Sequence, residues 1–306
     1  MTALIAGAYP SYPSDPPDRE EFLRLLGEDE RFGGLELPVK VGEPATWPSG
    51  APEHWAAVLT NIGFTMQTLA TTPEQGLASR DVEGRRAAIE QVRDLLDQTN
   101  ELKASGHPVI AVELHSAPAG GDPHALQDSL TRIASWDWGE TVICLEHCDA
   151  PRPGHDPEKG FLELGDEISA VHKAAQRRPS RLGITINWAR SVLEDRNVLT
   201  GLAHVAQARE AGVLAGLMFS SASPEQTSFG YPWIDAHLSL AGAPGSPESS
   251  VLTPRLLHDC LAAAGDLDYL GWKVGLDGVS SPADRAAAWG ELANSTLNAP
   301  QKTRAS

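Results

Sequence analysis

Cysteines, long apolar runs and basic clusters are scarce or absent in this 306-residue sequence. Its three cysteines are too few, and odd in number, for a disulfide framework, so we expect a protein of the reducing cytoplasm. No apolar run reaches the roughly 18 residues of a membrane span, and the first residues lack the basic stretch of a signal peptide. The net charge of -17, without any Lys/Arg-rich block, argues against binding to nucleic acid.

The sequence also lacks a Gly-x-Gly-x-x-Gly motif after its first apolar run, which a nucleotide-binding open sheet would carry. Instead, apolar runs alternate with helical patterns along the chain. The runs expected to form strands are 3–8, 34–37, 56–61, 109–115, 142–147, 182–187, 215–220 and 269–274. Short strands without polar alternation are typical of a parallel sheet covered on both faces, and eight of them close a (β/α)8 TIM barrel. We predict a single α/β barrel over residues 1–298 and a polar tail at 299–306.

Helical periodicity fills most intervals between these runs. The expected helices are 18–26, 81–102, 124–134, 163–175, 199–211, 254–264 and 282–294. By residue type and position, the expected N-caps are Asp81, Thr200, Thr253 and Ser281. The interval 39–55 is rich in proline and glycine and has the weakest helical pattern. The long segment 221–253 is expected to be a loop that covers the catalytic end of the barrel after strand seven.

Polar residues stand at the carboxyl ends of the expected strands, where barrel enzymes carry their active sites. Glu146 ends the most apolar run and can serve as a general base, a metal ligand or the partner of a cation. His147 should face the opposite way, because side chains alternate along a strand. Glu113 and His115 are two residues apart and should share a face, where His115 can act as acid, base or ligand near neutral pH.

Three cations are expected near the same end of the barrel in this acidic protein: Lys159, Arg190 and Lys273. Together they suit a phosphate, sulfonate or carboxylate group, and Arg190 can bind two oxygens at once. Lys273 lies in the expected eighth strand, so we expect it to be paired with a carboxylate or used in chemistry. Asp235 and His237 lie in the long loop, which can close over a polar substrate and exclude water.

Five short segments give the chain a resemblance to a known family. They are 34–38 (GLELP), 113–118 (ELHSAP), 146–150 (EHCDA), 186–188 (INW) and 216–220 (GLMFS). In these segments the chain resembles a bacterial branch, of unknown function, of the xylose-isomerase-like TIM-barrel superfamily. That superfamily includes sugar isomerases, sugar epimerases and apurinic-endonuclease-like enzymes. The resemblance covers nearly the whole chain and implies the barrel fold without bringing a known reaction.

The resemblance also bears on metal binding. Epimerases of the superfamily typically hold one divalent metal with Glu, Asp, His and Glu on strands five to eight. The corresponding residues here are Glu146, Asn187, Ser220 and Lys273, of which only Glu146 matches. A lysine ammonium cannot ligate a metal and would repel it. A divalent metal (Mn, Mg, Zn or Co) would therefore need His115, Asp235 or His237 beside Glu146; otherwise Lys273 replaces the charge of the metal and pairs with Glu146.

These observations predict a sugar isomerase or epimerase, acting by proton transfer beside a carbonyl, with an anionic sugar as one option. Glu146 would be the base, His115 or His147 the acid, and Lys273 a catalytic cation that stabilises the enediolate. The residues assigned to substrate binding are Glu113, Lys159, Asn187, Trp188, Arg190, Asp235 and His237.

Two other interpretations stay open. Glu113 and Glu146 could form the carboxylate pair of a lyase or hydrolase that acts on a glycoside. Alternatively, the barrel could bind a sugar without turning it over, because most of the superfamily ligands are missing. The expected partner is a small-molecule carbohydrate rather than nucleic acid or a membrane, and a homo-oligomer is left open.

Overall fold

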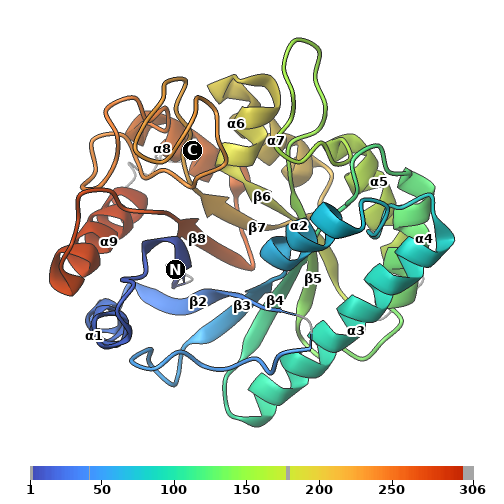
Figure 1. The fold of residues 1–306 in the computed structure, drawn as a ribbon, viewed down its shortest axis with the longest axis horizontal. Coiled ribbons are helices and arrows are strands. Elements are labelled where there is room, and N and C mark those ends of the chain that lie inside the picture. The colour runs from blue at the N-terminus through green and yellow to red at the C-terminus, as the bar shows by residue number, and fades with distance from the viewer. Residues whose placement is uncertain (1–2, 41, 177–179, 299–306) are drawn as a thin grey trace, which may run out of the picture.

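Eight parallel strands close into a barrel in the order of the sequence, and β8 pairs with β1 (Figure 1). The computed structural model describes residues 3–298, except 41 and 177–179, so the expected tail at 299–306 lies outside the described residues. The strands are β1 (Leu4–Gly7), β2 (Phe32–Pro38), β3 (Ala56–Thr60), β4 (Val109–Leu114), β5 (Val142–His147), β6 (Leu182–Asn187), β7 (Leu214–Phe219) and β8 (Tyr269–Lys273). The predicted TIM barrel is confirmed.

Helices surround the barrel on its outer side (Figure 1). They are η1 (Tyr9–Ser11), α1 (Pro16–Gly27), α2 (Ile62–Thr71), α3 (Val82–Ala104), α4 (Pro123–Ile133), α5 (Leu164–Ala175), α6 (Trp188–Asp195), α7 (Val198–Glu210), α8 (Pro254–Ala264) and α9 (Pro282–Leu297). Side chains cap the predicted N-termini at Asp81, Thr253 and Ser281. The expected cap at Thr200 is wrong, because that residue lies inside α7 and Asn197 accepts the hydrogen bond from Leu199 N instead. Among the helices of the described residues, none combines the length and apolar composition needed to cross a bilayer.

Alternation along the strands decides which side chains reach the inside of the barrel. In β5, Val142 and Cys144 belong to the small apolar cluster within the barrel, whereas Ile143 and Leu145 pack in the larger cluster beneath the helices. Glu146 continues the inward series. Side chains alternate in the same way along the other strands, so the last inward-facing residues of the parallel strands lie together at one end of the barrel. We call this end the mouth.

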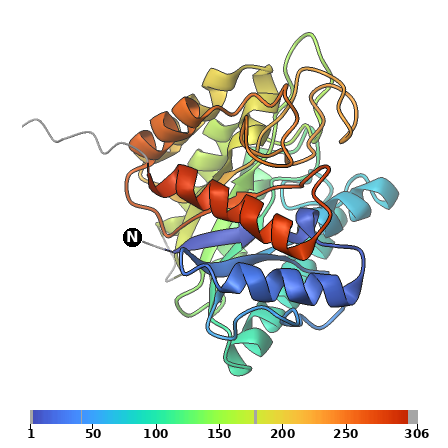
Figure 2. The ribbon, with the colours of Figure 1, turned by 90° about the vertical axis from the view of Figure 1, so that its left-hand side faces the viewer.

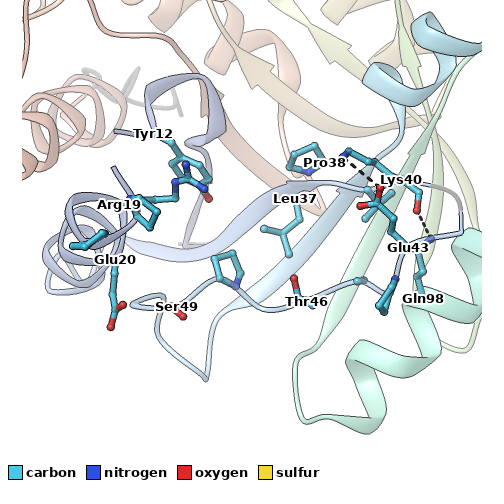
Figure 3. Close-up of a pocket in the computed structure, with 16 residues that line it drawn as sticks. Tyr12, Arg19, Glu20, Leu37, Pro38, Lys40, Glu43, Thr46, Ser49 and Gln98 are labelled. Atoms are coloured by element: carbon cyan, nitrogen blue, oxygen red, sulfur yellow. Dashed lines mark hydrogen bonds and ion pairs between the residues drawn. The ribbon is translucent and has the colours of Figure 1, made fainter. Parts of the chain in front are cut away.

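The described residues of the connection between β2 and β3, which are 39, 40 and 42–55, form no helix, in line with the weak helical pattern of this proline- and glycine-rich interval. Figure 1 shows only this loop between α1 and α3 in the outer layer. A cavity of about 830 Å³ lies there, lined by α1, the end of β2, the loop and Gln98 of α3 (Figure 3). Leu37 faces this cavity, whereas its neighbour Glu36 belongs to the inward series of β2.

The long loop predicted after strand seven is present between β7 and α8. In the side view of Figure 2 this loop and the N-terminus lie at opposite ends of the barrel. The loop is anchored by short contacts: Ser221 and Leu238 form an antiparallel bridge, and Gly275 N donates to His237 O at 2.8 Å. We call residues 221–253 the lid, because they cover the mouth.

Candidate active site

Glu146 lies at the centre of the mouth, and hydrogen-bond donors surround its carboxylate. Lys273 Nζ and Asn187 Nδ2 each lie 3.1 Å from Oε1. On the other side, His115 Nε2 lies 3.0 Å and Arg190 Nη1 2.6 Å from Oε2. These four residues, which the sequence analysis singled out separately, thus contact the same carboxylate. They lie directly after β4, in β6, in α6 and in β8.

Lys273 joins this carboxylate to a second one. Its Nζ lies 2.5 Å from Glu36 Oε1, so the ammonium bridges β2 and β5 across the barrel. Gly7 makes this arrangement possible, because a Cβ at that position would lie 2.5 Å from Glu36 Oε2. The missing side chain on β1 therefore leaves the space that the Glu36 carboxylate fills.

The lid adds a third carboxylate, Asp235. Arg190 Nε and Lys159 Nζ each donate to its Oδ2 at 3.0 Å, and His237 Nδ1 lies 3.4 Å from its Oδ1. Trp233 and His237 flank Asp235 with φ of 64° and 55°. Non-glycine residues seldom adopt this left-handed region, so the lid has a specific local conformation that aims Asp235 and His237 into the mouth.

Six residues therefore form one chain of alternating charge across the mouth, which we call the charge chain. In spatial order they are Lys159, Asp235, Arg190, Glu146, Lys273 and Glu36. Each cation in it has a carboxylate partner, and the chain is neutral when all its members are ionised.

The carboxylates of the charge chain differ in their proton affinity. Burial alone would raise the pKa of Glu146, but Arg190 and Lys273 hold it well below its usual value. Burial would likewise raise the pKa of Asp235, but Arg190, His237 and Lys159 hold it low. Glu36 has only Lys273 at contact distance, and burial raises its pKa above the ordinary 4.5. Glu36 is thus the most basic carboxylate of the three.

The histidines of the mouth are neutral. Burial lowers the pKa of His237 to about 3, although Asp235 opposes the shift. Burial also lowers the pKa of His115, against the effect of Glu146. Both ring nitrogens of His115 are engaged, since its Nδ1 lies 3.1 Å from Asn61 Oδ1. His237 therefore has the more available imidazole.

Several buried polar atoms of the mouth have no hydrogen-bond partner within the part of the chain that the structure describes. They are Glu36 Oε2, Thr60 Oγ1, Asp235 Oδ1 and His237 Nδ1. A buried polar atom without a partner costs roughly 1–3 kcal/mol. Most of these atoms are acceptors, so the mouth is suited to receive hydroxyl donors.

The mouth is closed in this conformation. Glu36, Glu146 and Lys273 are each 0% exposed. The lid is held to the loop after β5 at Glu158, which accepts hydrogen bonds from the Tyr231 hydroxyl at 2.7 Å and from Asp235 N at 3.2 Å. A substrate can reach the charge chain only after this lid moves.

At the position that corresponds to the metal site of the superfamily's epimerases, hydrogen-bond donors and cations surround Glu146 instead. Asn187 and Ser220 do stand beside Glu146, with Ser220 Oγ donating to Asn187 Oδ1 at 3.0 Å. However, both oxygens of Glu146 face N–H donors, and two of these donors are the charged groups of Lys273 and Arg190. A divalent cation at this position would be repelled by both, so the residues present do not fit a metal there.

His147 faces away from the mouth, as the alternation along β5 predicts. Its Nδ1 lies 2.7 Å from Glu167 Oε2 and its Nε2 3.2 Å from Glu194 Oε2. Burial would lower the pKa of His147, but these two carboxylates raise it to about 10. His204 packs edge-on against it, with ring centroids 4.9 Å apart. His147, Glu194 and His204 form a group that can hold a metal ion outside the barrel.

Two more residues nominated by the sequence lie away from the charge chain. Glu113 lies deeper in the barrel, where it accepts a hydrogen bond of 2.8 Å from the Tyr269 hydroxyl. Burial and the nearby Glu146 raise the pKa of Glu113 well above its usual value. Trp188 begins α6 and is fully buried against Gly201 of α7. The roles predicted for both remain predictions.

Sequence reasoning gave no role to Glu36. The signal was present, because a glutamate inside the apolar run Gly34–Leu37 is the same pattern that singled out Glu146. Thr60, at the end of β3, has a weaker signal, since threonine is common in strands. Both residues are among the polar side chains that the sequence places at the carboxyl ends of the strands, without a role, and the structure brings Glu36 into contact with Lys273.

Gly7→Ala tests whether the space beside Glu36 matters. The new Cβ would lie 2.5 Å from Glu36 Oε2 and 3.0 Å from Trp272 O, so we expect a loss of about 1–3 kcal/mol in the free energy of unfolding. Gly63→Ala in α2 is the matched control, because nothing lies within 4 Å of its added Cβ. Urea unfolding should separate the two variants, and equal stability would show that Glu36 has room to shift.

Comparison with known protein families agrees with this architecture. A family model described as "Domain of unknown function (DUF4862)" matches residues 5–287. An uncharacterized protein of Salmonella typhimurium is 34% identical over 293 residues, which cover 89% of each chain.

Solved structures with similar folds belong to the xylose-isomerase-like barrels, as the segment resemblance predicts. A proposed xylose isomerase of Rhodospirillum rubrum has a TM-score of 0.59 at 14% identity, covering 95% of this chain and 98% of that one. A D-psicose 3-epimerase, solved in the presence of D-fructose, has a TM-score of 0.53 at 13% identity, covering 97% and 96%. At such identities the likeness concerns the fold, which is that of sugar isomerases and epimerases.

Proposed function

This chain belongs to the DUF4862 family, and from the geometry of its mouth we propose that it is a sugar isomerase or epimerase that works without a metal in the barrel. The reaction is proton transfer beside the carbonyl of a neutral polyhydroxylated substrate. One observation carries this proposal: Lys273 bridges two carboxylates whose pKa values shift in opposite directions.

Opposite pKa shifts separate the roles of the two carboxylates. A carboxylate whose pKa is raised binds a proton more readily and can act as a base, whereas one whose pKa is strongly lowered stays ionised. We therefore assign the base to Glu36, whose Oε2 has no partner, and not to Glu146. Glu146 instead positions Lys273, Arg190, His115 and Asn187, all of which contact it.

In the proposed reaction Glu36 Oε2 removes the proton from the carbon next to the carbonyl. The electron pair of that C–H bond moves into the carbon framework, and the carbonyl oxygen gains negative charge as an enediolate forms. Lys273 stabilises this charge because its ammonium is already held between two carboxylates and needs no rearrangement. Return of the proton from Glu36 to the neighbouring carbon of the enediolate completes an isomerisation; epimerisation would require a second donor to deliver the proton to the opposite face.

Isomerisation also requires a proton to pass between two oxygens of the substrate. His237 suits this step, since its imidazole is neutral and its Nδ1 has no hydrogen-bond partner in the described part of the chain. A neutral imidazole can give a proton to one oxygen and accept a proton from another. His115 is less suited, because both of its ring nitrogens already have partners.

The charge chain favours a neutral sugar over an anionic one. Lys159, Arg190 and Lys273 all contact carboxylates, so none is left to balance a phosphate or carboxylate of the substrate. The unpartnered acceptors instead match the hydroxyl groups of a polyol. The D-psicose 3-epimerase among the similar structures was solved with a neutral ketose, which supports the same substrate class.

Solvent exchange provides the test of this proposal. The protein is incubated in deuterated water with D-fructose, D-psicose or D-fructose 6-phosphate, and loss of the proton beside the carbonyl is followed by NMR. We expect exchange into a neutral ketose, with kcat/KM at least about 100-fold lower for the phosphate, because a buried unpaired charge costs several kcal/mol. Faster exchange into the phosphate would contradict the neutral-sugar assignment. Binding of a ketose without exchange would favour the non-catalytic sugar-binding barrel.

A further inference from the structure

We propose that His147, Glu194 and His204 form a zinc site outside the barrel, independent of the proton-transfer chemistry at the mouth. The three side chains come from β5, α6 and α7, and one ligand atom from each lies within 4.8 Å of the others. All three residues are buried. Two imidazoles and one carboxylate are a set of protein ligands that zinc uses.

The distance between His147 and Glu194 agrees with tetrahedral coordination of zinc. Zinc lies about 2.0–2.2 Å from nitrogen and oxygen ligands, so the edges of its tetrahedron measure about 3.3–3.5 Å. His147 Nε2 lies 3.2 Å from Glu194 Oε2, and His204 Nε2 lies 3.8 Å from Glu194 Oε1. The ion takes the place of the proton between His147 and Glu194, and because the distance from His204 runs to the other oxygen of Glu194, binding through Oε2 requires His204 Nε2 to move toward that oxygen.

Groups around these ligands orient them for a metal. Glu167 Oε2 lies 2.7 Å from Nδ1 of His147, which leaves Nε2 facing Glu194 and is the usual arrangement of a metal-bound histidine. Ala150 N donates to Glu194 Oε2 at 2.9 Å. Arg152 pairs with the other oxygen of the same carboxylate, so Oε2 is the oxygen best placed for the ion.

The missing hydrogen bonds of His204 are a second observation that supports a metal site. It is 8% exposed, its Nδ1 has no partner, and its Nε2 makes no hydrogen bond within the described residues. A buried imidazole usually hydrogen-bonds through at least one nitrogen. Coordination through Nε2 supplies the missing interaction.

The surrounding charge attracts a cation. Glu167 and Glu194 are joined here by Glu163 and Asp195, which Arg152 contacts at 3.0 Å each. Within the described residues, these four carboxylates face two cationic groups, Arg152 and His147, so negative charge is in excess, and His147 gives up its proton when it binds the ion. The mouth differs in this respect, because its carboxylates are balanced by three cations.

A zinc ion here would tie β5 to α6 and α7, and through Ala150 and Arg152 to the loop that follows β5. That loop also carries Glu158 and Lys159, which hold the lid. All three protein ligands come from inside one subunit, and water would take the fourth position of a tetrahedral ion.

Zinc titration of metal-stripped protein tests the site. We expect one Zn²⁺ per chain by elemental analysis and calorimetry, a higher melting temperature with zinc, and the visible bands of four-coordinate Co²⁺ when cobalt is used instead. His204→Gln should weaken zinc affinity by about 100-fold or more, and His204→Cys should restore it, because thiolate is a zinc ligand. His124→Gln, on the exposed face of α4, is the matched control and should bind zinc like the wild type.

His204→Gln is expected to fold, since its side chain makes no hydrogen bond that the substitution would remove, and circular dichroism checks this. Zinc affinity unchanged by His204→Gln, or binding well below one ion per chain, would overturn the proposal. Loss of zinc in Glu36→Gln would place the ion at the mouth and would overturn it as well.

Discussion

Replacing Glu36 with Gln is expected to slow solvent-deuterium exchange into the substrate by about 10²- to 10⁴-fold, the usual contribution of a positioned acid–base group. The amide keeps the shape of the carboxylate and can still face Lys273, but it cannot accept the proton from carbon. The loss should therefore appear in kcat, with KM changed little. Glu36→Asp retains a carboxylate set back by one methylene and should recover part of the rate.

The pH dependence of the wild type adds a second measurement. The base must be ionised, so kcat/KM should rise with pH through the pKa of Glu36, which burial places above 4.5. If Glu146 were the base, the rate would already be maximal at that pH, because its pKa is held well below the ordinary value. Exchange that survives in Glu36→Gln with its acid limb intact would contradict our assignment.

Lys273→Met is expected to lower the free energy of unfolding by about 3–5 kcal/mol at neutral pH and to abolish exchange. Methionine fills similar space but leaves Glu36 and Glu146 buried without the ammonium that joins them. Removing one partner of a buried ion pair has a cost of this size. Urea unfolding gives the stability. Arg86→Met is the control, because it breaks the exposed pair with Glu83 and should cost less than about 1 kcal/mol.

The double variant Lys273→Met with Glu36→Gln makes this prediction sharper. It removes the Glu36 carboxylate, which loses its contacting cation in Lys273→Met whereas Glu146 keeps Arg190, so the double variant should be more stable than Lys273→Met alone. The difference in stability between the double variant and Lys273→Met should shrink as the pH falls toward 4.5. In Lys273→Met the buried Glu36 carboxyl group takes up a proton at low pH, which stabilises the folded state, and this stabilisation is lost as the pH rises. Additive effects of the two substitutions would show that Lys273 and Glu36 are not coupled.

The fold was predictable because each strand carries its own signal. An apolar run such as Val142 to Leu145 can form a buried strand wherever it pairs, and the count of eight limits the ways to close the sheet. Helices α2 and α6 were missed for a local reason. Each begins directly after a strand, at Ile62 and Trp188, so no turn separates the two patterns and the helix reads as a continuation of the strand.

The site was predictable only in part. Alternation along one strand correctly turned Glu146 and His147 to opposite sides. The partner of Lys273, in contrast, depends on closure of the barrel, which brings β8 beside β1 and places Glu36 of β2 within reach. The contact of Asp235 with Arg190 depends on left-handed φ values at Trp233 and His237, residue types that give no sign of that conformation in a sequence.

The charge chain makes the electrostatic state of the mouth depend on the position of the lid. Asp235 is the member of the charge chain that the lid carries, so withdrawing the lid removes one negative charge and leaves Lys159 without its carboxylate, while Arg190 keeps its contact with Glu146. With the lid withdrawn, the rest of the charge chain would carry one net positive charge, whereas the closed mouth is neutral. Capture of the neutral sugar proposed above should consequently be almost independent of ionic strength, whereas any weak binding of an anionic sugar phosphate should fall as salt screens its attraction to the open mouth.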